Sequence, residues 1–266
     1  MWGRFSILAR VRALALFVVT ASAQDSLNVR QVGFLSIHWE AAFSVAVVDT
    51  LAFVATGVTG LRIVNIADPA HPVEIGYYDT PGEGFGVAVS GNYAYVADGG
   101  SGLRVVNITN PAAPTEVGHC DTPGYAWCVA VSGNYAYVAS DGLRVVDITN
   151  PAAPSEVGYY EPGDALGVAV SGNYAYVATG DRGLRVVNVT NPSAPFEVGF
   201  YDTPGHACGV AVSGSYAYVA DGLYFGIYDC SAATGVSEAS ILHPSSFILH
   251  PFLFSQSVQS DNADYV

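Results

Sequence analysis

Short apolar runs recur along the chain at a nearly constant spacing, with polar turn residues between them. The run from Val87 to Ala97 reads VAVSGNYAYVA and recurs almost unchanged from Val129, Val168 and Val210. A weaker copy, VAVVDTLAFVA, starts at Val45. The five starts are 42 residues apart except for one interval of 39. A period of about 40 residues is typical of repeat architectures in which each unit stacks on its neighbours.

Each unit contains four strand-like runs. VAV ends in a Ser-Gly-Asn turn, and YAYVA alternates strand-forming residues on two faces. GLRVVNI follows a loop rich in Gly and Asp, and a run of the EVGYY type follows a proline turn such as Asn110–Pro114. Four short strands per unit of about 40 residues are typical of a propeller blade. The strands are apolar on both faces because neighbouring blades cover both.

The fifth unit has no fourth strand of its own, and the segment from Val29 to Phe34 resembles one. We therefore expect an all-β fold, a five-bladed β-propeller of four-stranded antiparallel blades, with the last blade closed by the N-terminal strand. Closure would remove the exposed strand edges that favour aggregation. An open array that pairs with another chain is the alternative.

The N-terminus has the three parts of a signal peptide. Arg4, Arg10 and Arg12 precede an apolar run, and Ala21-Ser22-Ala23 supplies the small residues of a cleavage site. We predict a signal peptide over 1–23, a propeller over 24–231 and an irregular tail over 232–266. The mature protein is then secreted or held at the cell surface, outside the cytoplasm. A short N-terminal anchor is the alternative.

Charge narrows the classes of partner. The chain has 9 basic and 23 acidic residues and a net charge of −14, and loss of three arginines with the signal takes it to −17. The sequence contains no lysine. An acidic surface repels nucleic acid and anionic membranes, so we predict no nucleic-acid partner and no membrane insertion after signal cleavage. Lysine Schiff-base chemistry is excluded. We expect a monomer.

The segments GLRIVNIADP, GLRVVNITNP and GLRVVDITNP, together with the VAVSGNYAYVA runs, resemble the LVIVD repeat family of bacterial exported proteins. The resemblance covers roughly residues 29–231. It implies a propeller outside the cell or on its surface, and no single activity. From Thr234 the tail is similar to the linker before a type IX secretion sorting domain, but the usual core of that domain is absent.

Acidic residues at one repeat position are weak candidates for a cation ring: Asp79, Asp121, Glu161 and Asp202. Clustered carboxylates bind hard cations such as calcium. We favour a structural role instead, in which each caps its own turn, because a turn needs such a residue in every repeat. We therefore predict no metal and no cofactor.

Residues in the loops before each first strand differ between repeats and are the candidate binding residues: Trp39, Glu83, Tyr125, Asp164 and His206. Exposed aromatic side chains on such a rim are typical of interaction surfaces. We predict a non-catalytic binding or scaffold module for a protein or a glycan. The alternative is a carbohydrate-active enzyme in which Glu83 and Asp164 act as the paired carboxylates. Phe85 and Trp127 align with apolar residues and are assigned to the core.

Arginine follows Gly-Leu in four repeats, and we assign it to ion pairs with acids of the same or an adjacent blade in preference to an anion-binding ring. These residues are Arg62, Arg104, Arg144 and Arg185. Asn107 and Asn188 begin glycosylation-type triplets, but Asp147 in the matching place favours turn capping.

Cys208 and Cys230 replace apolar residues and are predicted to fill core positions. A disulfide between Cys120 and Cys128 remains open.

Overall fold

The computed structural model describes residues 30–35, 39, 41–161 and 163–235. The predicted signal peptide and nearly all of the predicted tail lie outside these residues. The chain divides into a short N-terminal part, Met1–Val32, and a main body, Gly33–Val266. All the strands and the one described helix lie in the main body.

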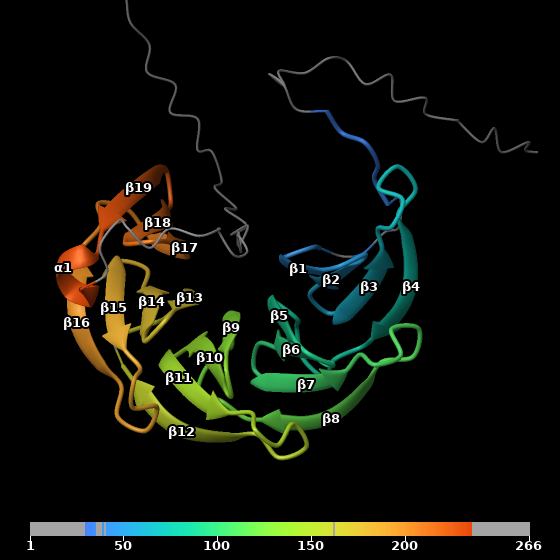
Figure 1. Cartoon of the computed structure of the whole chain (residues 1–266), viewed down its shortest axis with the longest axis horizontal. Helices are drawn as coiled ribbons and strands as arrows, with labels where there is room; N and C mark the ends of the chain where they lie inside the picture. Colours follow the sequence, from blue (N-terminus) through green and yellow to red (C-terminus); the bar gives the residue numbers. More distant parts are fainter. Residues whose placement is uncertain (1–29, 36–38, 40, 162, 236–266) are drawn as a thin grey trace, which may run out of the picture. The chain divides into compact units, whose positions relative to one another are not determined.

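The main body consists of five antiparallel sheets in chain order (Figure 1). Each sheet is a meander in which every strand pairs with the next along the chain. The first sheet comprises β1 (Ser44–Val48), β2 (Leu51–Ala55), β3 (Leu61–Asn65) and β4 (Val73–Tyr78). The second comprises β5 (Gly86–Ser90), β6 (Tyr93–Ala97), β7 (Leu103–Asn107) and β8 (Thr115–Cys120). The third comprises β9 (Cys128–Ser132), β10 (Tyr135–Ser140), β11 (Gly142–Asp147) and β12 (Ser155–Tyr160).

The fourth sheet comprises β13 (Gly167–Ser171), β14 (Tyr174–Ala178), β15 (Leu184–Asn188) and β16 (Phe196–Tyr201). The fifth has three strands, β17 (Ala207–Ser213), β18 (Tyr216–Asp221) and β19 (Tyr224–Asp229), followed by the short helix α1 (Ser231–Thr234). No helix in the described part of the chain is long and apolar enough to cross a membrane.

The first strands of all five sheets, β1, β5, β9, β13 and β17, line one central cavity of about 220 Å³. Consecutive first strands contact one another along the series. The arrangement confirms the predicted propeller architecture, with the first strand of each blade innermost and its fourth strand outermost.

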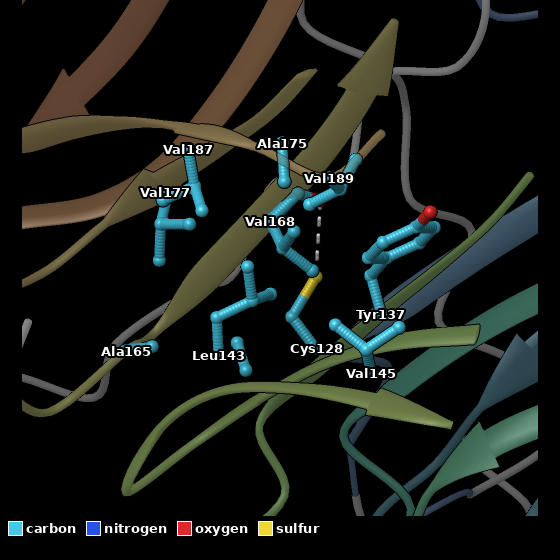
Figure 2. Close-up of a cluster of buried hydrophobic side chains, with 11 residues drawn as sticks. Cys128, Tyr137, Leu143, Val145, Ala165, Val168, Ala175, Val177, Val187 and Val189 are labelled. Atoms are coloured by element: carbon cyan, nitrogen blue, oxygen red, sulfur yellow. Dashed lines mark hydrogen bonds between the residues drawn. The ribbon is translucent and has the colours of Figure 1, made fainter. Parts of the chain in front are cut away.

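The hydrophobic core consists of repeated clusters between consecutive sheets. One of them joins the third and fourth sheets, where Tyr137, Leu143 and Val145 pack against Val168 and Val177 (Figure 2). Each of the other three junctions between consecutive sheets has an equivalent cluster. Because each inner sheet contributes to two clusters, its second and third strands are apolar on both faces, as the sequence predicts.

The predicted closing strand is not formed in this structure. Residues 30–35 contain no strand, and among the described residues the fifth sheet has no fourth one. Gly33 nevertheless lies against the first sheet as an outer strand would, because a side chain there would collide with the carbonyl oxygen of Pro69. Gly76 of β4 meets Pro111 of the next sheet in the same way.

The two ends of the series have uncovered apolar faces. Val45 of β1 is 45% exposed, whereas its equivalent Val87 is 1% exposed. By strand register Phe225 of β19 is equivalent to Leu103 of β7, yet Phe225 is 67% exposed and Leu103 is fully buried. In the inner sheets, the equivalent faces are covered by the neighbouring sheet.

Candidate functional site

Four of the five predicted rim residues occupy the same position in successive repeats, four residues before the first valine of the first strand. They are Glu83, Tyr125, Asp164 and His206. The fold therefore sets them at one end of consecutive sheets. Three of them, Tyr125, Asp164 and His206, line a single cavity of about 710 Å³ that spans the third, fourth and fifth sheets.

The cavity lies beside the short loop between β10 and β11. A single residue, Asp141, separates β10 from β11, whereas residues 98–102 connect β6 to β7 and residues 179–183 connect β14 to β15. Each longer loop reaches the rim residue of the next sheet. A Cβ added at Gly99 would lie 3.4 Å from Tyr125, and one at Gly180 would lie 2.8 Å from His206. The one-residue loop between β10 and β11 does not extend in this way, and Asp164 is exposed.

One wall of the cavity is aromatic. The rings of Tyr125 and Trp127 stack with centroids 5.6 Å apart, and Trp127 also contacts Phe85 at 4.8 Å. Tyr125 is 51% exposed, and Trp127 is partly exposed and lines the cavity. The assignment of Phe85 to the core is confirmed, whereas the assignment of Trp127 to the core alone is wrong. Its ring connects the core to the cavity.

Charged residues also line the cavity. Asp141, Asp164, Asp181 and Arg182 line the cavity. His206 Nδ1 lies 2.7 Å from an oxygen of Asp181, which links the fifth sheet to the β14–β15 loop of the fourth. Asp164 and His206 were predicted from the sequence as binding residues, whereas Asp141, Asp181 and Arg182 were not. The available signals were the shortened loop at Ser140 and the charged pair Asp181-Arg182, which lies in a loop whose other residues are threonine and glycine.

The floor of the cavity contains a hydroxyl without a partner. Ser140 lines the cavity and is 2% exposed, and its Oγ makes no hydrogen bond. The equivalent residue of the second sheet, Asp98, accepts hydrogen bonds from Thr80 Oγ1 and from the backbone N–H of Gly82 at 2.8 Å. Serine is too short to do the same for Thr122, whose Oγ1 is also buried and unpaired.

Glu83 and Trp39 lie apart from the cavity. Glu83 is exposed on the rim of the second sheet and is not among the lining residues. Trp39 packs against Ala52, Val54 and Val64 of the first sheet, and its Nε1 donates a hydrogen bond to Glu74 at 2.9 Å. The carboxylate pair Glu83 and Asp164 that the enzyme hypothesis requires is therefore not brought into this cavity.

The acidic ring has a different role from both interpretations offered by the sequence. Asp79 pairs with Arg62 at 3.0 Å, and Asp202 pairs with Arg185 at 2.7 Å. Glu161 lies 3.4 Å from Arg144. These three acids bind the repeated arginines of their own sheets. Within the described ranges, no three His, Cys, Asp or Glu side chains gather as a metal site would require.

The second sheet departs from this pattern. Arg104 approaches Glu116 at 3.4 Å and the buried Asp98 at 3.7 Å, not Asp121. The prediction that the repeated arginines form ion pairs is confirmed. Burial, the largest influence on Asp98, raises the pKa of its carboxyl, although its hydrogen bonds and Arg104 oppose the shift.

All four cysteines are free. Cys128 lies in the core with its Sγ 3.8 Å from the carbonyl oxygen of Val168, and burial raises the pKa of its thiol to about 11 (Figure 2). A Cys120–Cys128 disulfide is therefore absent, and the core positions predicted for Cys208 and Cys230 are confirmed.

The predicted caps at Asn107 and Asn188 are also confirmed. Each accepts a hydrogen bond at 2.9 Å from the backbone N–H two residues later. Asp147 does the same at 2.8 Å.

Similar solved structures share the fold at low sequence identity. A functionally unknown protein from Desulfotomaculum acetoxidans is 13% identical, with a TM-score of 0.66 over 84% of this chain and 76% of that one. The computationally designed Ika8 protein is 10% identical, with a TM-score of 0.58, and the match spans 72% of this chain and 59% of Ika8. The β-propeller domain of Cps50 (Swd1) from Myceliophteria thermophila is 11% identical, with a TM-score of 0.56 over 68% of this chain and 66% of that one.

No curated protein matches the sequence. The model of the LVIVD repeat matches residues 41–80, 81–122, 123–161, 162–203 and 204–242. These five tandem matches, each covering one of the five sheets, show that the chain belongs to the LVIVD repeat family.

Proposed function

We propose that the chain is a non-catalytic binding module that works outside the cytoplasm and takes its partner on the rim formed by the loops before the first strands. The observation that carries the proposal is the convergence of Tyr125, Asp164 and His206 on one cavity. These residues share a repeat position at which the copies differ, whereas the framework residues around them repeat. Variation confined to one end of a rigid scaffold is typical of binding loops.

The cavity supports binding more than catalysis. Its volume lies within the range of about 300–1,000 Å³ that is usual for ligand sites. Its aromatic wall offers contact area at low entropic cost, as interaction sites require. The two singular acids of the enzyme hypothesis lie on different sheets, and only Asp164 lines the cavity.

The test is a binding screen of the chain from residue 24 against arrays of oligosaccharides and of peptides from extracellular proteins. Tyr125→Ala and His206→Ala should each weaken a hit at least tenfold. Asn173→Ala, in the exposed hairpin turn at the other end of the fourth sheet, should leave it unchanged. Loss of binding in the Asn173 variant together with full retention in both rim variants would contradict the proposal.

A further inference from the structure

The 710 Å³ cavity has the properties of a built site and not of an accidental gap. One loop of the repeat is shortened in this chain, and Ser140 lies at its base, where the second and fifth sheets have a buried aspartate. The cost is two buried hydroxyls, Ser140 Oγ and Thr122 Oγ1, that make no hydrogen bond within the described structure. Leaving buried polar groups unpaired destabilises a fold. Such groups are retained where a ligand or an ordered water satisfies them.

The charges of the lining residues favour some classes of ligand over others. Three acidic residues, Asp141, Asp164 and Asp181, line the cavity together with Arg182 and His206. An excess of acids disfavours an anionic ligand. A cationic ligand could pair with the carboxylates but would leave Arg182 without a partner from the ligand. A neutral polyhydroxylated ligand uses both kinds of group, because its hydroxyls donate to the carboxylates and accept from the arginine.

The aromatic residues of the cavity also favour a neutral polyhydroxylated ligand. The rings of Tyr125 and Trp127 stack nearly parallel, with an angle of 26° between them. The exposed ring of Tyr125 offers a flat apolar surface beside the polar groups. A saccharide has this combination of apolar C–H faces and hydroxyl edges, so it can contact the ring and the acids at once.

We infer that this cavity between the third, fourth and fifth sheets is a binding site for a neutral saccharide, with Tyr125 as the stacking surface and Asp164, Asp141 and Arg182 as hydrogen-bonding groups. Ser140 lies at the base of the site. The inference rests on the proposed binding function and specifies its ligand class.

The test uses the chain from residue 24 and an array of neutral and acidic oligosaccharides, with hits measured by titration calorimetry. Asp164→Asn and Tyr125→Ala should each lower the affinity for a neutral hit at least tenfold. Glu83→Gln is the matched control, because Glu83 is an exposed acid at the same repeat position outside the cavity, and it should leave the affinity within twofold.

A loop graft tests the cavity itself. Replacing Ser140-Asp141-Gly142 by the sequence of residues 98–102, Asp-Gly-Gly-Ser-Gly, should cover Asp164 and abolish saccharide binding. The same graft supplies the carboxylate that Thr122 lacks, so the folded chain should be as stable as the parent or more stable. Asp164→Asn keeps the inference testable if the graft does not fold.

The outcomes separate the ligand class from the wider function. Equal losses in the Glu83 and Asp164 variants would overturn the site, as would binding of acidic oligosaccharides alone. Failure of every saccharide, with a lysine-rich peptide captured in a Tyr125-dependent manner, would overturn the ligand class and leave the binding function standing. Failure of all probes would overturn both. Release of new reducing ends from a hit would contradict a non-catalytic module.

Discussion

At the scale of single residues, two buried carboxylates tie loops to the sheets that follow them. Asp98 accepts hydrogen bonds from Thr80 and Gly82, and Asp221 accepts from Thr203 Oγ1 at 2.5 Å and from Gly205 N at 2.8 Å. Both carboxylates are fully buried. The Asp-Thr-Pro-Gly turns that begin at Asp79 and Asp202 are thus fixed by their threonine and glycine, while their first aspartate pairs with arginine.

Thr80→Val is expected to lower the free energy of unfolding by about 1.5–3 kcal/mol, because it removes one donor from a buried carboxylate without changing the side-chain shape. Thr122→Val is the matched control, since its hydroxyl makes no hydrogen bond and its loss should be nearly neutral. Urea denaturation followed by tryptophan fluorescence measures both. Equal effects in the two variants would show that Asp98 does not depend on Thr80.

At the scale of elements, the outer strands of consecutive sheets are joined by tyrosine–glutamate hydrogen bonds. Tyr78 of β4 donates to Glu116 of β8 at 2.9 Å, and Tyr160 of β12 donates to Glu197 of β16 at 2.5 Å. Trp39 donates to Glu74 of β4 in the corresponding place. The bonds connect the blades at their outer strands, and Tyr78 and Tyr160 also pack against the apolar clusters between the sheets.

These tyrosines predict a dependence of stability on alkaline pH. Burial and then the hydrogen bond to glutamate raise the pKa of Tyr160 to about 12, above its ordinary value of 10.0. The neutral phenol is therefore favoured in the folded state, and its contribution is complete below pH 10 and lost as the pH rises through about 12. Ultraviolet titration of tyrosinate and thermal melting across this window measure the effect.

Tyr160→Phe should flatten the decline in melting temperature between pH 10 and 12 and remove one late-titrating phenol. Tyr159→Phe is the control, because Tyr159 is exposed and its ring lies over Arg144, a contact that phenylalanine keeps. Identical pH profiles for the parent and the Tyr160 variant would contradict the assignment.

At the scale of the whole molecule, the fifth sheet differs from the others because it has no outer strand among the described residues. Gly33 meets Pro69 as Gly76 meets Pro111 and Gly118 meets Pro151. Trp39 repeats the hydrogen bond of Tyr78 and Tyr160 to the next sheet. The segment around these residues therefore contacts the first sheet as the outer strand of a preceding sheet does, although β19 has no fourth partner in the described residues.

Deletion of residues 24–35 is expected to lower the melting temperature of the whole fold, because it uncovers the first sheet and removes the segment available to pair with β19. Gly33→Ala should destabilise by about 1–3 kcal/mol through its collision with the Pro69 carbonyl. Val32→Ala changes a neighbouring exposed residue and should leave the free energy of unfolding nearly unchanged. Unchanged melting after the deletion would rule out a closing role.

The sequence determined the blade, because each strand and turn follows from local patterns that recur in register. VAV and YAYVA form β5 and β6 as their strand propensity and the Ser-Gly-Asn turn require, and Asn107 caps its turn through its own side chain. It also identified the rim position, since Tyr125, Asp164 and His206 differ where the other positions repeat.

Only the tertiary structure decided which of these residues meet. The cavity exists because the β10–β11 loop is too short to cover Asp164, and that depends on how the third sheet packs on the fourth. At the third sheet, Ser140 and Thr122 are left without a hydrogen-bond partner among the described residues. In the first sheet, the pairing of β3 with β4 brings Asp79 to Arg62. These contacts join residues far apart in the chain. Local preferences therefore specify the elements, and the spatial order of the sheets specifies the site.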